Sequence, residues 1–220
     1  MVLVSGVDDA GRGAVLGPLV VAGVLVEKER LNLLSELGVR DSKTLTPKKR
    51  KQLAHQITKT VNDYCIIKVS PHDIDKVVRS NRRLHKLNRL EAKAMAEVIC
   101  RLKPDIVYVD ASDVLAGRFR LHILEEVPFQ VRIVSKHKAD KIYPVVSAAS
   151  ILAKVERDKA ILEISKKYGD VGSGYAADPR TIKFLEKWIM KYGYFPEFVR
   201  KSWKTVKMIR DEIKQKKLMS

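Results

Sequence analysis

The sequence predicts an α/β fold in which a mixed sheet is flanked by helices and a helical region follows at the C-terminus. Two observations lead to this prediction. Apolar segments typical of strands come early and alternate with amphipathic segments typical of helices, whereas helical patterns dominate the end of the chain. The 220 residues suffice for one domain with a small appendage. We place the sheet-bearing domain in residues 1–170 and the helical region in residues 171–220, packed on or beside it.

Two strands are predicted near the N-terminus, on either side of a glycine-rich turn. Residues 3–7 are apolar and β-prone, and they lead into Asp8-Asp9. The turn over residues 11–17 is rich in glycine, and residues 19–26 are nearly all apolar, which is typical of a buried strand. A short helix is expected over residues 27–37.

Helix-start signals define the next elements. Thr46-Pro47 combines a capping side chain with a proline that is tolerated at the first helical position, so a helix should run from there to about residue 60. Residues 63–69 have the composition of a strand. Ser70-Pro71 should begin another helix for the same reason as Thr46-Pro47.

The spacing of apolar residues predicts the helix and strands in the middle of the chain. Leucine and other apolar residues recur every three or four positions over 84–102, which predicts an amphipathic helix. A short strand over 106–109 ends at Asp110, and an alternating strand is expected over 129–134.

The last third of the chain should be helical. A long helix is predicted over 145–162, ending before Gly169, with Pro144 near its first turn because an interior proline would break it. Asp178-Pro179 should open a further helix, and a last one follows from Ser202.

The charge balance points to a polyanionic partner. The chain has 43 Lys and Arg against 26 Asp and Glu, a formal charge of +17, with basic clusters at 48–51, 79–86, 136–138 and 214–217. Each cluster alone is typical of a solvated helix face, but together they favour a track for a nucleic-acid backbone. Two cysteines without metal-ligand spacing argue against a zinc site or a disulfide framework. Without a membrane-length apolar run or a signal sequence, we expect a cytoplasmic protein that binds no membrane.

Four carboxylates lie at apparent ends of strands or at junctions between strands and helices: Asp8, Asp9, Asp110 and Asp140. Ligands of open α/β sheets gather at strand ends, and clustered carboxylates there would need cations such as Mg²⁺ or Mn²⁺. Neighbouring side chains on a strand point to opposite faces, so Asp8 and Asp9 can share a site only if the strand ends or twists between them. Aspartates also cap helices and fill turns, which is the alternative at each position.

Gly11-Arg12-Gly13 allows two interpretations. A phosphate-binding turn of a dinucleotide fold does not fit, since Leu16 occupies the last fingerprint position and a strand follows. The other interpretation is a tight turn whose backbone N–H groups approach a sugar or phosphate, but from these residues alone an ordinary glycine-rich hairpin is favoured. Tyr175, in a glycine-rich loop, can stack on a base or sugar or can pack against the sheet edge.

Several short motifs occur together in a specific order. They are Val7-Asp8-Asp9-Ala10-Gly11-Arg12-Gly13, Gly17-Pro18-Leu19, Asp41-Ser42-Lys43, Val109-Asp110-Ala111, Lys138-Ala139-Asp140 with Lys154-Val155-Glu156-Arg157-Asp158, and Gly172-Ser173-Gly174-Tyr175 with Asp178-Pro179. In this order they resemble the ribonuclease HII family, in its archaeal-like branch, over most of the chain.

The resemblance implies a ribonuclease H-like catalytic domain and a C-terminal helical region that helps to hold a duplex. It implies cleavage of RNA in RNA–DNA hybrids and incision on the 5′ side of single ribonucleotides in duplex DNA, leaving 3′-hydroxyl and 5′-phosphate ends. Asp8, Asp9, Asp110 and Asp140 would hold two Mg²⁺ or Mn²⁺ ions. Gly11, Arg12 and Gly13 would meet the 2′-hydroxyl of the ribonucleotide, Tyr175 would stack on the next sugar, and Lys43 would contact a phosphate.

Asp9 departs from the family pattern, which has glutamate at this position. Aspartate is one methylene shorter, so its oxygens fall about 1.5 Å short of the usual place unless the backbone shifts. Because Mg²⁺ demands near-ideal octahedral geometry, we predict that the enzyme favours Mn²⁺ or is slower with Mg²⁺.

Two other functions share parts of this pattern. One is a non-enzymatic nucleic-acid-binding protein that keeps the fold, with Asp9 as a sign that the site has decayed. The joint retention of five site residues argues against it: Asp8, Asp110, Asp140, Arg12 and Tyr175. A DNA nuclease on a related sheet would share the metals but would not need residues that sense a 2′-hydroxyl. Cleavage that depends on a ribonucleotide separates these functions. We expect the chain to act as a monomer.

Overall fold

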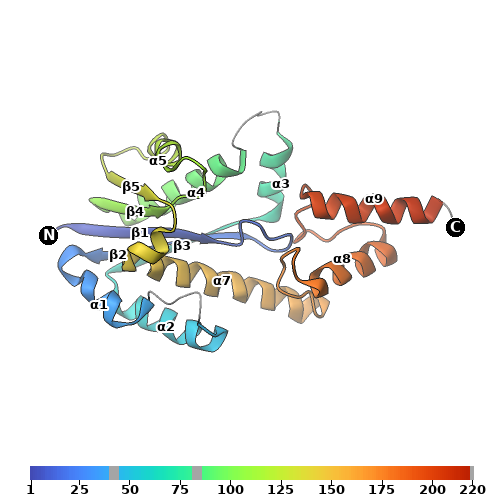
Figure 1. The fold of residues 1–220 in the computed structure, drawn as a ribbon, viewed down its shortest axis with the longest axis horizontal. Helices are drawn as coiled ribbons and strands as arrows, with labels where there is room; N and C mark the ends of the chain where they lie inside the picture. The colour runs from blue at the N-terminus through green and yellow to red at the C-terminus, as the bar shows by residue number, and fades with distance from the viewer. Residues whose placement is uncertain (40–44, 81–85, 219–220) are drawn as a thin grey trace. The chain divides into compact units, whose positions relative to one another are not determined.

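A computed structural model describes residues 1–39, 45–80 and 86–218 of the protein (Figure 1). Its backbone contacts divide the chain into two compact units. One unit comprises residues 1–10, 20–68 and 84–156, and the other comprises 11–19, 69–83 and 157–220. The division by contacts is discontinuous in sequence and falls within one long helix, after Glu156. The boundary that we expect after residue 170 differs from it and stays a prediction.

The first unit is built on a five-stranded mixed sheet with the order β3-β2-β1-β4-β5. The strands are β1 (Leu3–Ala10), β2 (Leu19–Glu27), β3 (Asp63–Val69), β4 (Ile106–Asp110) and β5 (Arg132–Lys136). β1 pairs antiparallel with β2 but parallel with β4, and β4 pairs parallel with β5. The predicted mixed sheet is therefore confirmed.

Helices cover both faces of this sheet (Figure 1). On one face lie α4 (Lys86–Leu102) and α5 (Ala116–Leu124); on the other lie α1 (Leu31–Glu36), α2 (Pro47–Thr60) and the first part of α7 (Pro144–Tyr168). Two glycines show how closely the helices approach. A Cβ at Gly6 of β1 would lie 2.3 Å from the backbone carbonyl carbon of Val145, and a Cβ at Gly23 of β2 would lie 2.4 Å from Val98 Cγ1. Larger residues at these positions would push the helices off the sheet.

The second unit is mainly helical. It contains α3 (Pro71–Arg79), the last turns of α7, α8 (Pro179–Tyr192) and α9 (Lys204–Leu218). Leu16, Leu185, Phe195 and Val206 belong to its apolar core. The buried carboxylate of Asp75 in α3 accepts hydrogen bonds from the backbone N–H groups of Lys201 and Ser202, at 2.8 and 2.9 Å, which fixes the segment before α9.

Local signals placed most helix starts correctly. Thr46 Oγ1 accepts a hydrogen bond from the N–H of Lys49, and Ser70 Oγ accepts one from the N–H of Asp73, at 3.3 and 3.1 Å. α7 begins at Pro144 and ends just before Gly169, which adopts φ +85°. These predictions are confirmed because capping and proline effects act within one helical turn.

Two local predictions differ from the structure, and two helices were not predicted. The helix expected over 27–37 is a 3₁₀ turn (Lys28–Arg30) followed by the short α1. The strand expected over 129–134 is β5, shifted toward the C-terminus because Ser135 and Lys136 pair with Val109 and Asp110 of β4. Pairing with a neighbouring strand decides these bounds, and polar residues at the strand end carry no apolar signal. Helices α5 and α6 (Ala139–Ile142) are not predicted from the sequence.

In residues 1–39, 45–80 and 86–218, no helix is long and apolar enough to cross a membrane.

Candidate active site

The four predicted carboxylates all belong to the first unit. Asp8 and Asp9 lie on β1, Asp110 is the last residue of β4, and Asp140 lies in α6. β1 and β4 are parallel, and their register ends with Val7 opposite Val109. Asp8 and Asp110 therefore follow at the same end of neighbouring strands, on the same face of the sheet.

Asp9 lies on the other face. β1 continues past both aspartates, since Asp8, Asp9 and Ala10 all pair with residues of β2. The strand therefore does not end between Asp8 and Asp9, and successive side chains on it alternate. Their partners agree with this: Asp8 has a hydrogen bond with Ser150 of α7, whereas Ser112, beyond β4, lies 3.5 Å from Oδ1 of Asp9.

Asp8 lies in a strongly perturbed electrostatic environment. Its side chain is buried, with 6% of its surface exposed. Burial raises the pKa of Asp8 well above its ordinary value, and the negative charges of Asp9 and Asp110 raise it further. Hydrogen bonds from Ser150 and from the N–H of Asp9 oppose this rise in pKa without cancelling it. A cation at this place would relieve the repulsion.

The segment between β5 and α7 brings Asp140 close to Asp110. The N–H of Ala139 donates a hydrogen bond of 3.0 Å to Oδ1 of Asp110, and Asp140, the next residue, is buried. Lys138 turns the chain into α6 with a left-handed backbone, φ 55°. This turn places the residues after β5 at the end of β4, which explains how Asp140 comes near Asp110.

The donor chemistry of this set suits a hard divalent cation. All four side chains offer carboxylate oxygens, which Mg²⁺ and Mn²⁺ prefer, and Asp8 is destabilised by the charges around it. As the side chains stand, no three His, Cys, Asp or Glu residues in the described part of the chain are arranged to hold a metal ion. Asp8 and Asp9 lie on opposite faces of the continuous strand β1, which separates the side chain of Asp9 from those of Asp8 and Asp110. The oxygen donors fit the ions, and the side chains need a local adjustment to enclose them.

The residues expected to contact the substrate are Gly11, Arg12, Gly13, Tyr175 and Lys43. The first four belong to the second unit, and Lys43 lies outside the described residues. Gly11 adopts φ +90°, and its carbonyl accepts a hydrogen bond of 3.2 Å from the N–H of Ala14, which closes a tight turn around Arg12 and Gly13. Gly13 is exposed, and a Cβ there would meet no atom within 4 Å. Ala14 forms an antiparallel bridge with Tyr175. The structure thus brings the Gly-Arg-Gly turn and Tyr175 together.

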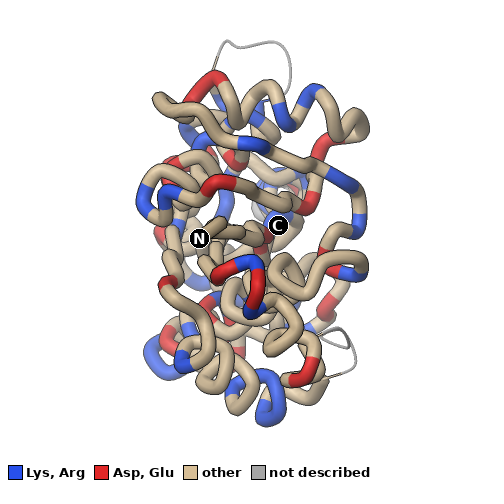
Figure 2. Tube along the Cα trace, turned by 90° about the vertical axis from the view of Figure 1, so that its left-hand side faces the viewer, with Lys and Arg blue, Asp and Glu red and all other residues tan. Residues whose placement is uncertain are grey.

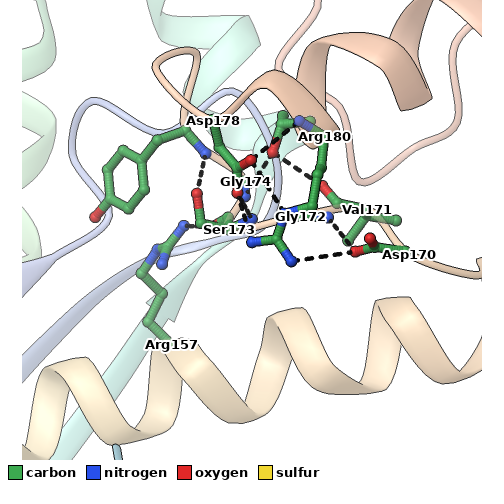
Figure 3. Close-up of polar contacts among 10 residues, drawn as sticks. Arg157, Asp170, Val171, Gly172, Ser173, Gly174, Asp178 and Arg180 are labelled. Carbon is green, nitrogen blue, oxygen red and sulfur yellow. Dashed lines mark hydrogen bonds and ion pairs between the residues drawn. The ribbon is translucent and has the colours of Figure 1, made fainter. Parts of the chain in front are cut away.

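Arg157 of α7 contacts both the turn and Tyr175, and no role was predicted for it from the sequence. Its guanidinium carbon lies 4.2 Å from the centroid of the Tyr175 ring, and its Nη2 donates a 2.6 Å hydrogen bond to the carbonyl of Ser173 (Figure 3). A Cβ at Gly11 would lie 2.9 Å from Arg157 Nε. Burial lowers the pKa of Arg157, while the nearby Tyr175 and Asp158 act in the opposite direction. The stack fixes one face of the tyrosine ring.

The loop that carries Tyr175 is held in place by the start of α8 (Figure 3). Asp178 caps this helix and accepts a hydrogen bond of 2.7 Å from the N–H of Ser173, and Arg180 is bound to the same carboxylate. These contacts hold the pKa of Asp178 well below its ordinary value. Gly172 and Gly174 adopt positive φ, and a Cβ at Gly172 would lie 2.7 Å from Thr181 Oγ1. Only glycine fits this close approach, so the motif shapes the loop.

Basic residues are distributed over many elements. Figure 2 shows Lys and Arg positions recurring along much of the trace, with acidic positions between them. Lys48, Lys49 and Lys51 are exposed on α2, and Lys136 and Lys138 are exposed around the end of β5. These exposed cations of the first unit fit the predicted contact with a polyanion.

Sequence reasoning missed the supporting polar residues. Ser150, Ser112 and Arg157 contact predicted site residues, but each is a common residue type in a helix or loop. A weak signal existed for Ser112, which follows Asp110 by two positions. The pairing of a serine with an aspartate from another strand becomes visible only in three dimensions.

Comparisons with known proteins agree on one family. The family model described as Ribonuclease HII matches residues 5–206. The ribonuclease HII of Thermococcus sibiricus is 46% identical over 217 residues, covering 98% of this chain and 94% of that protein. The solved ribonuclease H2 from Pyrococcus horikoshii has a TM-score of 0.89 at 40% identity and covers 97% of this chain and 99% of its own. Ribonuclease HII from Archaeoglobus fulgidus, solved in complex with PCNA, has a TM-score of 0.85 at 44% identity, covering 94% and 96% of the two chains.

Proposed function

The chain belongs to the ribonuclease HII family, a family of metal-dependent nucleases that cleave RNA in RNA–DNA hybrids, and from this premise we propose its substrate range and mechanism. We propose that it also incises duplex DNA on the 5′ side of single embedded ribonucleotides, leaving 3′-hydroxyl and 5′-phosphate ends. The observation that carries the proposal is the placement of Asp8 and Asp110 at the same end of two adjacent parallel strands, with Asp8 buried among like charges.

Asp8, Asp9, Asp110 and Asp140 are the proposed ligands of two Mg²⁺ or Mn²⁺ ions. When bound, such ions lower the pKa of a water and stabilise the charge on the leaving oxygen. The residues of the chain supply the rest of the arrangement. The N–H of Ala139 orients one oxygen of Asp110, and Ser150 and the N–H of Asp9 orient Asp8. Each of these hydrogen bonds stabilises the ionised carboxylate, which is the form that binds a cation.

Recognition of the ribonucleotide is assigned to the second unit. The turn Gly11-Arg12-Gly13 presents backbone groups without side-chain obstruction at Gly13, as contact with a 2′-hydroxyl requires. Tyr175 offers one ring face to a sugar while Arg157 covers the other. The role of Lys43 in binding a phosphate stays a prediction from the sequence.

The charge of +17 supports binding to the backbones of hybrid and duplex substrates. We propose that the chain acts as a monomer in the cytoplasm. Light scattering of the free protein and of its complex with a duplex would measure the number of chains in each.

The test is cleavage of a labelled DNA duplex with one ribonucleotide. An RNA–DNA hybrid, an all-DNA duplex and an all-RNA duplex run beside it, with Mg²⁺ or Mn²⁺. The expected result is one cut 5′ to the ribonucleotide, no cut in all-DNA, and no cut by Asp110→Asn, which should still bind the duplex. Cutting of all-DNA would identify a DNA nuclease instead. Tight, salt-sensitive binding without cutting by either metal would identify a binding protein.

A further inference from the structure

Helix α8 carries two rows of side chains for which the proposed mechanism has no use. A lysine recurs every four residues along the helix, and an aromatic residue directly follows each lysine. Residues four apart lie on one face of a helix, so each set forms a row and the two rows are neighbours. The lysine row is Lys183, Lys187 and Lys191, and the aromatic row is Phe184, Trp188 and Tyr192.

Both rows line a groove on the surface of the second unit. One hollow, with a volume of about 480 Å³, is lined by the lysine row and the aromatic row together. A second hollow, of about 690 Å³, shares Tyr168, Trp188 and Tyr192 with the first and extends to Tyr194. Because the two hollows meet at the shared rings, they form one groove, which we call the α8 groove. Each volume lies in the range of ligand sites, about 300–1,000 Å³.

Two rings of the α8 groove are open to solvent. Tyr192 is 43% exposed and Tyr194 is 63% exposed. Their ring centroids lie 6.4 Å apart, and the centroid of Trp188 lies 4.4 Å from that of Tyr192. Tyr168 and Phe184, in contrast, pack against the apolar core of the unit. The fold therefore accounts for the inner rings of the groove but not for the two exposed tyrosines.

The cations beside these rings are available to an anion. Lys183 and Lys187 are exposed, and neither forms an ion pair within the part of the chain that the structure describes. Nζ of Lys191 lies 4.9 Å from the centroid of the Tyr192 ring. The groove thus combines free positive charge with exposed aromatic surface.

The α8 groove begins beside the loop that carries Tyr175. Arg180 lines its first hollow and binds the carboxylate of Asp178. The same carboxylate accepts the hydrogen bond from the N–H of Ser173 in the Tyr175 loop (Figure 3). Groove and loop belong to the same unit, so a strand that leaves a duplex near Tyr175 has the groove next to it.

We propose that the α8 groove binds an unpaired stretch of nucleic acid that continues from the substrate duplex; its place beside the duplex rests on the function proposed above. Bases stack on Tyr192 and Tyr194, and phosphates lie along the lysine row. Basic grooves with aromatic side chains are typical of surfaces that bind single strands. A duplex would leave the rings unused, because its bases stack on one another. The charge of +17 and the nuclease family favour a nucleic acid over an acidic protein partner.

The test compares three forms of one RNA–DNA hybrid by fluorescence anisotropy, with the full-length protein in a chelator so that no strand is cut. One form is blunt, and one carries a single-stranded DNA extension of about ten nucleotides, a length within the range of single-strand sites. The third carries the same extension without bases, and extensions at the 3′ and 5′ ends are tried separately. We expect an extension at one end to tighten binding at least tenfold, and the abasic extension to recover only part of this gain.

Variants assign the gain to the α8 groove. Tyr192→Ala and Tyr194→Ala should each weaken binding of the extended hybrid about fivefold to tenfold and leave binding of the blunt hybrid unchanged. Lys187→Gln should weaken binding of both extended forms alike, with an effect that shrinks at high salt. Two residues of the first unit supply matched controls that should change nothing: Tyr64→Ala, since Tyr64 is 45% exposed on β3, and Lys93→Gln, since Lys93 is exposed on α4.

Every other outcome decides against the proposal. It is overturned if neither extension tightens binding, which would leave the groove to a protein partner, or if the abasic extension gives the full gain, which would mean a phosphate track without stacking. Equal losses on blunt and extended hybrids in the tyrosine variants would also overturn it. If Tyr192→Ala does not fold, Tyr194→Ala, whose ring is more exposed, gives the same decision.

The two proposals fail separately. Anisotropy in a chelator does not depend on cleavage, so a wild type that cuts no ribonucleotide substrate would overturn the proposed function alone. A wild type that cuts normally but gains no affinity from any extension would overturn the single-strand site alone.

Discussion

The backbone N–H of Asp9 donates a hydrogen bond of 2.7 Å to Oδ1 of Asp8, although the two side chains lie on opposite faces of β1. The hydrogen bond ties the backbone of Asp9 to the side chain of Asp8, while the side chain of Asp9 extends from the other face of the strand. It stabilises the ionised form of Asp8, but burial and the charges of Asp9 and Asp110 outweigh it, and the pKa of Asp8 is raised. The folded protein therefore holds this carboxylate in an unfavourable state, which the proposed binding of a cation would relieve.

Replacing Asp8 should stabilise the metal-free protein. Because the folded-state pKa of Asp8 lies above its ordinary value of 3.8, the folded state binds a proton more tightly than the unfolded state, and stability falls as pH rises through this interval. At pH 7, with a chelator present to keep both proteins metal-free, Asp8→Asn should thus have a higher melting temperature than wild type. Adding Mn²⁺ should raise the melting temperature of wild type more than that of the variant. Equal melting temperatures in the chelator would show that Asp8 is not strained.

Asp9→Glu should change the metal preference. The longer side chain restores the reach of the family's glutamate, and Mg²⁺ tolerates misplaced ligands less well than Mn²⁺. We expect the ratio of the Mg²⁺ rate to the Mn²⁺ rate on an RNA–DNA hybrid to rise by a few fold in the variant. Both rates are measured at saturating metal, with Glu97→Gln as a control. An unchanged ratio would mean that the chain already compensates for the shorter side chain.

Two glycines of the Gly-Arg-Gly turn should respond differently to alanine. Gly11 has φ +90°, and an added Cβ would lie 2.9 Å from Arg157, so Gly11→Ala combines backbone strain with a clash. The backbone term alone costs about 1–2 kcal/mol, and the melting temperature should drop. Gly13→Ala meets nothing within 4 Å and should leave the melting temperature nearly unchanged. Thermal melts of both variants, followed by circular dichroism, make the comparison; equal drops would contradict it.

The contribution of Asp178 to stability should disappear in acid. Its pKa is lowered chiefly by the hydrogen bond from Arg180, then by the N–H of Ser173. A lowered folded-state pKa means that Asp178 stabilises the fold above its ordinary value of 3.8, and that this stabilisation is lost as pH falls toward the folded-state pKa. Asp178→Asn should therefore melt below wild type at pH 6, and the difference should shrink at pH 3. A difference that is constant with pH would assign the effect to capping geometry alone.

Tyr175 and Arg157 should act together in selecting the substrate. Tyr175→Ala removes the ring that is proposed to stack on the sugar, and Arg157→Lys removes the planar group behind it. Loss of one stacking contact costs about tenfold. We expect cleavage at a single embedded ribonucleotide to fall by this factor in Tyr175→Ala, and more than cleavage of an RNA–DNA hybrid. Arg157→Lys should change the same ratio in the same direction; a uniform loss on both substrates would assign these residues to general binding or folding.

Many local features of the fold were predictable because their causes lie within a few residues. Thr46-Pro47, Ser70-Pro71 and Asp178-Pro179 each mark a helix start that the structure confirms. β5 and α5 were misplaced or missed for the opposite reason. The register of β5 follows from its pairing with β4, and α5 follows the loop at Asp113, whose carboxylate binds Arg118 within that helix. Neither cause is visible in a local pattern.

By itself, the sequence determined the family, the mixed α/β architecture and the types of side chain that a metal-dependent nuclease needs, since these depend on composition, motif order and local propensity. The tertiary structure decided which of these side chains meet. Parallel pairing of β1 with β4 aligns Asp8 with Asp110, whereas the uninterrupted course of β1 turns Asp9 toward Ser112 and Glu91. Contacts of this kind join residues about a hundred positions apart. Only strand register and helix packing fix them, and no short-range pattern encodes either.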